Sequence, residues 1–110
     1  MINFEYKNNN LTINSKVVKF NNTIEDVINF DDIIIVMLMD EGVPENNIIA
    51  FDEQGNKLWD ISKIIILPYG ETYVAMSRVN DNSISVISYS GLETYIDIRK
   101  QSVISKIIRK

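Results

Sequence analysis

The longest strongly apolar run in this 110-residue chain is Ile33-Ile34-Ile35-Val36-Met37-Leu38-Met39. Its first four residues are β-branched, and β-branched side chains lose χ1 freedom in helices but fit well on pleated sheets. The run is also far too short for a membrane-spanning helix, which needs about 20 residues. We therefore expect residues 33–39 to form a β-strand.

Other short apolar or alternating runs recur on both sides of this strand. The further candidate strands are Ile2–Tyr6, Leu11–Ile13, Lys16–Phe20, Asn47–Phe51, Lys57–Ile61, Ile64–Leu67, Thr72–Arg78, Ser83–Ser88, Thr94–Ile98 and Val103–Ile108. Clusters of Asn, Asp, Gly and Ser separate them, and these residues tolerate positive φ or cap turns. The spacing predicts a single all-β domain over residues 1–110. Its antiparallel meander would form a small barrel, a sandwich or a partial-propeller-like sheet assembly.

Two segments could form short helices instead. Residues 23–28 begin with Thr23, a good N-cap residue, and carry Glu25 and Asp26 where the first turn would lie. The tail, residues 102–110, has apolar residues at helical spacing, although its β-branched content favours a strand. Both alternatives stay open for the tail.

The clearest local pattern is Asn47-Ile48-Ile49-Ala50-Phe51-Asp52-Glu53-Gln54-Gly55-Asn56-Lys57-Leu58-Trp59-Asp60-Ile61. It predicts a hairpin in which Ile49 and Phe51 share one strand face and an Asp-to-Gly turn reverses the chain. Trp59 and Ile61 share a face of the return strand. Because Trp59 alternates with a charged residue, we expect its ring to pack in the core and not to stack on a ligand.

This stretch resembles the blade hairpin of quinoprotein-type (PQQ-like) β-propellers, in which an Ala-Phe-Asp-x-x-Gly-x-x-Leu-Trp string is typical. Residues 95–104 resemble a degraded second copy that keeps Asp97 but has Gln101 near the place of the turn glycine. A propeller needs at least about four blades, so the length of the chain excludes a closed single-chain propeller. The resemblance implies no quinone site, because the hairpin is scaffold.

The chain contains no cysteine and no histidine. Disulfides, thiolate nucleophiles and sulfur metal sites are therefore excluded, and the commonest general base and neutral metal ligand are missing. We expect no cofactor and no metal site. The first seven residues show no signal peptide, and no apolar run is long enough to span a membrane. A cytoplasmic protein without membrane contact is the expectation.

Paired carboxylates are the remaining candidates for chemistry. They occur as Glu25-Asp26, Asp31-Asp32, Asp40-Glu41 and Asp52-Glu53. Two carboxyl groups about 5–10 Å apart can hydrolyse a glycosidic bond, so a carbohydrate or peptide hydrolase is the least implausible enzyme. The pairs lie at predicted strand ends and turns, where solvated caps are normal, and we expect no enzymatic activity. Residues 52–56 lack the glycine spacing of a calcium-binding EF-hand loop and are interpreted as a turn.

Charge is distributed unevenly. Residues 25–60 carry ten acids and one base, a local net charge of −9, whereas the last twelve residues carry five bases and no acid. The simplest interpretation is a solvated acidic surface balanced by a basic tail. The functional interpretation is an acidic face that docks a basic protein, since complementary potentials accelerate association. The same charge balance argues against direct binding of nucleic acid.

The leading hypothesis is therefore a non-catalytic binding protein of the immunity or inhibitor type, which covers a basic partner such as a toxin nuclease. The wider layout also resembles small bacterial proteins of unknown function, and some of these are immunity proteins. The expected partner-binding residues are Glu25, Asp26, Asp31, Asp32, Asp40, Glu41, Glu45, Asp52, Glu53 and Tyr69, the last in an exposed turn. The alternative is a structural module that self-associates, as in a homodimer, through its sheet edges.

Overall fold

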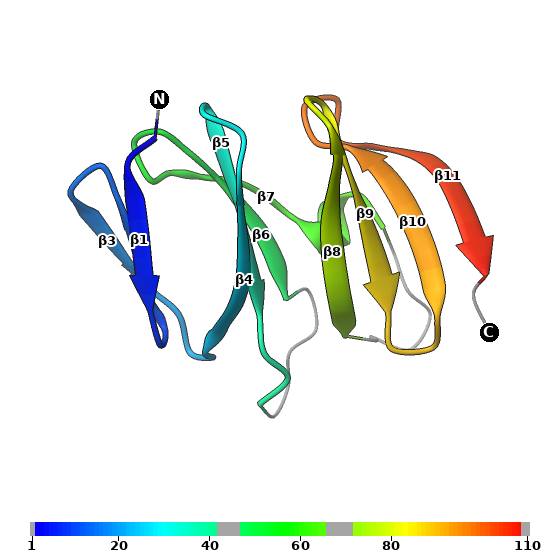
Figure 1. Ribbon diagram of the computed structural model, residues 1–110, viewed down its shortest axis with the longest axis horizontal. Coiled ribbons are helices and arrows are strands. Elements are labelled where there is room, and N and C mark those ends of the chain that lie inside the picture. Colours follow the sequence, from blue (N-terminus) through cyan, green and yellow to red (C-terminus); the bar gives the residue numbers. More distant parts are fainter. Residues whose placement is uncertain (1, 42–46, 66–71, 109–110) are drawn as a thin grey trace.

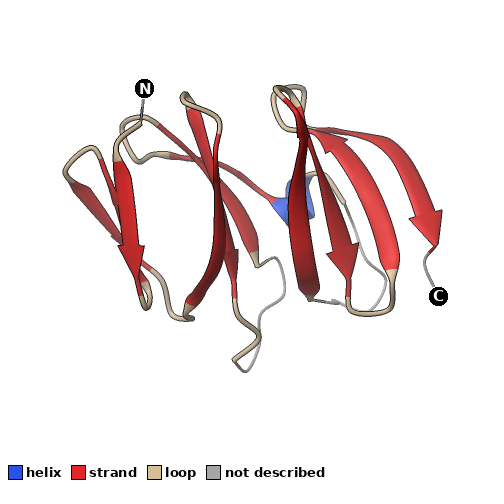
Figure 2. Ribbon diagram, viewed as in Figure 1, coloured by secondary structure: helices blue, strands red, loops and turns tan. Residues whose placement is uncertain are grey.

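The computed structural model describes residues 2–41, 47–65 and 72–108, and these residues form three antiparallel sheets (Figures 1 and 2). The N-terminal sheet contains β1 (Phe4–Lys7), β2 (Asn10–Ile13) and β3 (Lys16–Lys19). The middle sheet contains β4 (Ile24–Asn29), β5 (Ile33–Leu38), β6 (Ile48–Asp52) and β7 (Lys57–Asp60). The C-terminal sheet contains β8 (Tyr73–Asn80), β9 (Ser83–Ser88), β10 (Leu92–Asp97) and β11 (Ser102–Ile108). The predicted all-β fold is confirmed.

Within each sheet, every strand pairs with its neighbour in the sequence, so each sheet is a simple meander. The three sheets follow one another along the longest dimension of the molecule, with the middle sheet between the other two (Figure 1). The principal extents are 40 × 31 × 19 Å. The described strands close no barrel, and the arrangement that they adopt is face-to-face packing of successive sheets.

The middle sheet has apolar residues on both faces, and β5 shows why. Alternate side chains of a strand point to opposite faces. Ile33, Ile35 and Met37 belong to the core shared with the C-terminal sheet, whereas Ile34 and Val36 belong to the core shared with the N-terminal sheet. All five are buried, with exposed fractions of 8% or less. A continuous apolar run thus specifies a strand that is covered on both sides.

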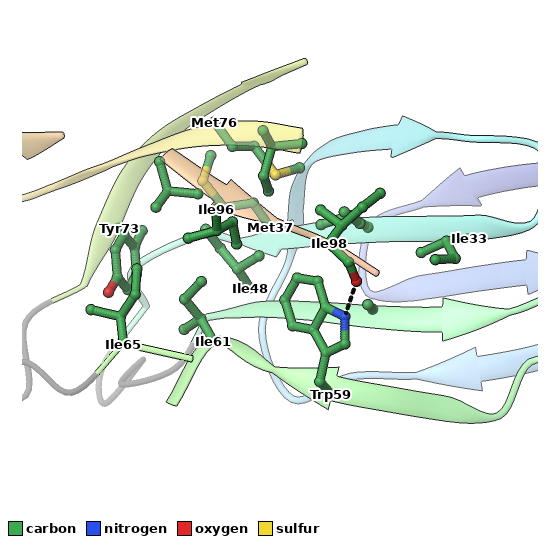
Figure 3. Packing of buried hydrophobic residues seen from close by; sticks show 14 of the residues in the cluster. Ile33, Met37, Ile48, Trp59, Ile61, Ile65, Tyr73, Met76, Ile96 and Ile98 are labelled. Carbon is green, nitrogen blue, oxygen red and sulfur yellow. Dashed lines mark hydrogen bonds between the residues drawn. The ribbon is translucent and has the colours of Figure 1, made fainter. Parts of the chain in front are cut away.

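The core between the middle and C-terminal sheets, here the large core, is shown in Figure 3. Trp59 enters it from β7 and is 2% exposed, which confirms the prediction that its ring packs in the core. Its indole Nε1 donates a hydrogen bond to the carbonyl oxygen of Ile98 at 3.0 Å, so one side chain joins the two sheets by both packing and hydrogen bonding. Buried indole N–H groups require such a partner.

The core between the N-terminal and middle sheets, here the small core, is built on a smaller set of side chains. From the N-terminal sheet, Leu11 and Ile13 of β2 are fully buried in it. Phe51 enters from β6, and its ring meets that of Phe20 edge-on at a centroid distance of 5.8 Å. This geometry is a favourable arrangement for two aromatic rings.

Both predicted Asp-containing turns form hairpins. The Asp52 carboxylate accepts hydrogen bonds from the backbone N–H groups of Gln54 and Asn56, each at 2.9 Å. At the β10–β11 turn, Asp97 accepts hydrogen bonds from the N–H groups of Arg99 and Lys100. Gly55 has φ +78°, a conformation that favours glycine, and a Cβ there would lie 2.7 Å from Cδ of Lys16, so the Lys16 side chain would have to move. In the second turn, Gln101 adopts φ +55° itself.

Two open alternatives about local structure are decided, and one predicted strand is wrong. Residues 24–29 form β4 and not a helical turn, because the apolar side of this segment packs on the small core through Ile24 and Val27. The strand expected over Ile64–Leu67 does not form in its described part: Ile64 caps a short 3₁₀ helix, Ile61–Lys63. The tail is a strand, β11, through residue 108.

The two-faced burial of β5 makes a specific prediction for adjacent residues. Ile34→Ala and Ile35→Ala should each lower the free energy of unfolding by about 2–5 kcal/mol, because each leaves a cavity in a different core. Urea denaturation followed by circular dichroism measures both. Val17→Ala, at a position that is 54% exposed, is the control and should cost less than about 0.5 kcal/mol. If only one of the two isoleucines proved costly, β5 would have a solvent face.

Candidate partner-binding surface

The structure divides the predicted acidic face between two opposite ends of the middle sheet. Asp52 lies opposite Ile33 in the ladder, while Ile24 lies opposite Leu38 near the other end of β5. The first end therefore carries Asp31, Asp32, Asp52 and Glu53, and the second end carries Glu25, Asp26, Asp40 and Glu41. Glu45 and Tyr69 lie outside the described residues.

At the first end, Asp32 is engaged in an ion pair between sheets. Arg99, which follows β10, donates from Nη1 to Asp32 Oδ2 at 2.5 Å and from Nη2 to Asp32 Oδ1 at 3.1 Å. The guanidinium also donates to the side chain of Asn82 at 2.9 Å and to the carbonyl of Asp81 at 3.2 Å. These bonds from the Arg99 side chain hold the pKa of the Asp32 carboxyl below its usual value of 3.8. This pair fastens the middle sheet to the C-terminal sheet.

The other acids at the first end include one with a clear structural role. The Asp52 carboxylate caps its own turn, and the hydrogen bond from the Asn56 amide is the main cause that lowers its pKa. The positive charge of Lys16 lowers it further. Asp31 adopts φ +73°, and its backbone N–H donates a hydrogen bond to Asn29 Oδ1 at 2.9 Å. The first end is thus a set of turns with mixed charge.

The second end carries the four acids Glu25, Asp26, Asp40 and Glu41, which we call the acidic edge cluster. Backbone bonds bring the two segments together, since Met39 N–H donates to the carbonyl of Thr23 at 2.7 Å. Glu41 Oε1 accepts the Thr23 N–H at 2.6 Å, and this bond lowers the pKa of the Glu41 carboxyl. Glu25 and Asp26 lie on β4, which is the outermost strand of the middle sheet. The cluster is therefore exposed along a sheet edge.

No base neutralises the acidic edge cluster among the described residues. The ion pairs in the described part of the chain are Lys57–Asp60, Arg78–Asp81 and Arg99–Asp32, and none of them involves an acid of the cluster. Two lysines on the N-terminal sheet lie near the same end, but Lys7, Asn10 and Lys19 share one row of the ladder, adjacent to the row of Leu11, which points into the small core. Lys7 and Lys19 therefore point away from the middle sheet, and the cluster keeps its negative charge.

Asn47 is a structurally important residue that the sequence did not distinguish from an ordinary strand-end asparagine. It is 2% exposed and precedes β6. Its Nδ2 donates to the carbonyls of Leu38 at 2.8 Å and Tyr73 at 2.9 Å, and its Oδ1 accepts the Tyr73 N–H at 2.9 Å. One amide thus satisfies three backbone groups and ties the middle sheet to β8.

Three further observations concern metal binding, membrane insertion and the Asp52 turn. They contain no group of three or more His, Cys, Asp or Glu side chains that could hold a metal ion. In the same part of the chain, no helix is long and apolar enough to cross a membrane. The Asp52 oxygens bond to amides of their own turn, in agreement with the interpretation of residues 52–56 as a turn.

Comparison with known proteins gives a family but no activity. A family model described as a domain of unknown function, DUF7957, matches residues 1–106. A search of curated proteins found no match. Residues 47–61 do form the predicted hairpin, β6–β7. Neither the structure nor the comparisons support a relation to quinoprotein propellers.

Acid titration should report on the Asp32–Arg99 pair. A carboxyl whose folded-state pKa is lowered stabilises the protein above its unfolded pKa, and this stabilisation is lost as the pH falls through the folded pKa. We expect the free energy of unfolding to decrease below about pH 4. Asp32→Asn should be less stable than the parent at pH 7, by no more than about 1 kcal/mol because the pair is partly exposed, and should lose less on acidification. Urea denaturation of both proteins at pH 7 and at pH 2.5 measures this difference. If the parent and Asp32→Asn lost the same free energy of unfolding between the two pH values, the pair would have no role in the acid dependence.

Asn47→Asp should destabilise the protein by about 3 kcal/mol, because a buried carboxylate cannot donate to the Leu38 and Tyr73 carbonyls. Asn10→Asp, the same change at an exposed position, should cost less than about 0.5 kcal/mol. Urea denaturation at neutral pH compares the two. Equal effects would show that the Asn47 amide is not needed as a donor.

Proposed function

The chain belongs to the DUF7957 family, a domain of unknown function, and we propose that it is a non-catalytic binding module whose acidic edge cluster docks a basic protein. The single observation that carries this proposal is the unneutralised charge of Glu25, Asp26, Asp40 and Glu41 at one exposed end of the middle sheet. Four carboxylates at one end of a sheet create a local negative potential. Such a potential steers a basic partner and raises its association rate.

Backbone hydrogen bonds hold two of the four carboxylates in place, which supports a binding role. Glu41 is fixed by the Thr23 amide, and Asp26 Oδ1 accepts a hydrogen bond from the Val27 N–H at 2.9 Å. A bulge between Ile24 and Asp26 interrupts the pairing of β4 with β5. Charge and a bulge also protect an edge strand from pairing with other chains, so this edge is suited to side-chain contacts and not to strand addition.

The proposed partner is a basic protein, and the proposed role is that of an immunity or inhibitor protein acting in the cytoplasm. A nuclease toxin is the partner class that fits best, because a nuclease needs basic residues to hold phosphate groups. An acidic protein that covers those residues would compete with the nucleic acid. The same negative charge disfavours contact between this chain and nucleic acid itself.

The positions of the acids also support a role without catalysis. Asp32 pairs with Arg99, while Asp60 bonds to Ser62 and lies 2.9 Å from Lys57 Nζ. Asp52 caps a turn. Each of these carboxylates is held as an anion by donors of its own fold, whereas a general acid needs a raised pKa.

Charge reversal at the cluster tests the proposal. The variant Glu25→Lys/Asp40→Lys avoids the Glu41 cap and changes the net charge by +4. Binding should be measured by isothermal titration against the product of the neighbouring gene and against a panel of basic nucleases, at low and at physiological salt. We expect a salt-sensitive complex whose Kd rises at least about tenfold in the variant.

Glu5→Lys/Glu53→Lys is the matched control, because it makes the same charge change away from the cluster. It should leave Kd within about twofold of the parent value. Equal weakening by both variants would show that only net charge matters and would refute the assigned surface. A complete lack of binding to every basic probe would refute the docking function.

A second candidate function, self-association, is favoured by a separate observation. It concerns the outer face of the C-terminal sheet, where apolar side chains are exposed. The acidic edge cluster takes no part in it.

A further inference from the structure

The two outermost faces of the molecule differ in character. On the N-terminal sheet, the row of Tyr6, Leu11 and Val18 points toward the small core. The rows on either side therefore point outward. These outward rows are Glu5, Thr12 and Val17, and Lys7, Asn10 and Lys19. This face is charged and polar, as expected where a stack of sheets ends in water.

The C-terminal sheet presents an apolar outer face instead. Ile84 and Ile96 point into the large core, so their neighbours Ser83 and Tyr95 point outward. A depression of about 250 Å³ lies on this face and crosses all four strands of the sheet. Its lining residues are Val79, Asn80, Ser83, Tyr95, Ile104, Ser105 and Ile107.

The apolar side chains at this depression are exposed. Val79 is 48% exposed, Ile104 is 58% exposed and Ile107 is 45% exposed. They come from β8 and β11, the two outermost strands of the C-terminal sheet, which lies at one end of the molecule (Figure 1). Aliphatic side chains that gather over a depression, with polar residues between them, are typical of an association surface.

The charge of this sheet favours another copy of the same chain as the occupant. Residues 72–108 carry four bases and three acids, whereas the described residues from 2 to 65 carry five bases and ten acids. Two copies that meet through their C-terminal sheets would bring the nearly neutral ends of the two molecules together and keep their acidic parts apart.

We propose that the chain forms a two-fold symmetric dimer in which the outer faces of two C-terminal sheets pack on each other. This contact would continue the face-to-face packing that already joins the three sheets within one chain. Head-to-tail stacking is disfavoured, because the apolar face of one copy would then meet Lys7, Lys19 and Glu5 on the N-terminal sheet of the next. An isologous contact uses the apolar face of each copy once and closes the assembly.

Sedimentation equilibrium of the full chain over a wide concentration range tests the dimer. We expect a species of twice the 12.7 kDa chain mass. The variant Ile104→Lys/Ile107→Lys should raise the dimer Kd at least about tenfold, because it places cations where apolar side chains would pack. Val17→Lys, an equally exposed apolar position on the outer face of the N-terminal sheet, should leave the Kd unchanged. A parent chain that stays monomeric at millimolar concentration would overturn the proposal.

A single spin label separates this dimer from other assemblies, since the chain has no cysteine of its own. Labels on Ser105→Cys, at the depression, should show strong dipolar coupling between copies. Labels on Thr12→Cys, in an outward row of the N-terminal sheet, should show none. The opposite pattern would place the contact on the N-terminal sheet. An assembly without strong coupling at either position would indicate head-to-tail stacking, in which equal positions lie one molecular repeat apart. Either result refutes the proposal. Circular dichroism of each variant verifies that the fold is retained, and binding of a basic protein is measured separately because it involves the middle sheet.

Discussion

Both faces of the middle sheet are covered by other sheets, and the rest of the structure depends on this constraint. β5 sends Ile35 into the large core and Ile34 into the small core, so one strand supports two layers at once. The Trp59–Ile98 hydrogen bond, the Asn47 amide and the Asp32–Arg99 pair then fix the C-terminal sheet to this support. Because both cores share the same strands, we expect loss of packing on one face to weaken the other, and the three sheets to unfold as one cooperative unit.

Much of the fold could be predicted from the sequence, because strands and turns depend on local residue types. The Ile33–Met39 run, the Asp52 turn and the hairpin around Trp59 are found where their patterns indicate them. β4 was ambiguous because Thr23, Glu25 and Asp26 also fit a helix start, and only packing on the small core decides against it. The stacking of three sheets depends on contacts between distant segments, and strand spacing alone does not specify it.

The candidate site was predictable in composition but not in arrangement. The acids of residues 25–60 are close in sequence. An antiparallel meander, however, reverses the direction of the chain after every strand, so successive turns lie at opposite ends of the sheet. Proximity along the chain therefore put Asp31 and Asp40 on one expected face, although they lie at opposite ends of β5. The partner of Asp32 is 67 positions away, and no local pattern marks such a pair. The exposed tail strand was likewise visible only as an apolar stripe with two possible conformations.

The meander order within each sheet has a consequence for how the chain acquires its structure. Every ladder joins strands that are consecutive in the sequence, so each hairpin closes a short loop and can form early. The contacts of long range are those between sheets, which form once the hairpins exist. A β-protein built in this way has a lower contact order than a sandwich with Greek-key crossings, and it is expected to fold faster than most all-β domains of its size.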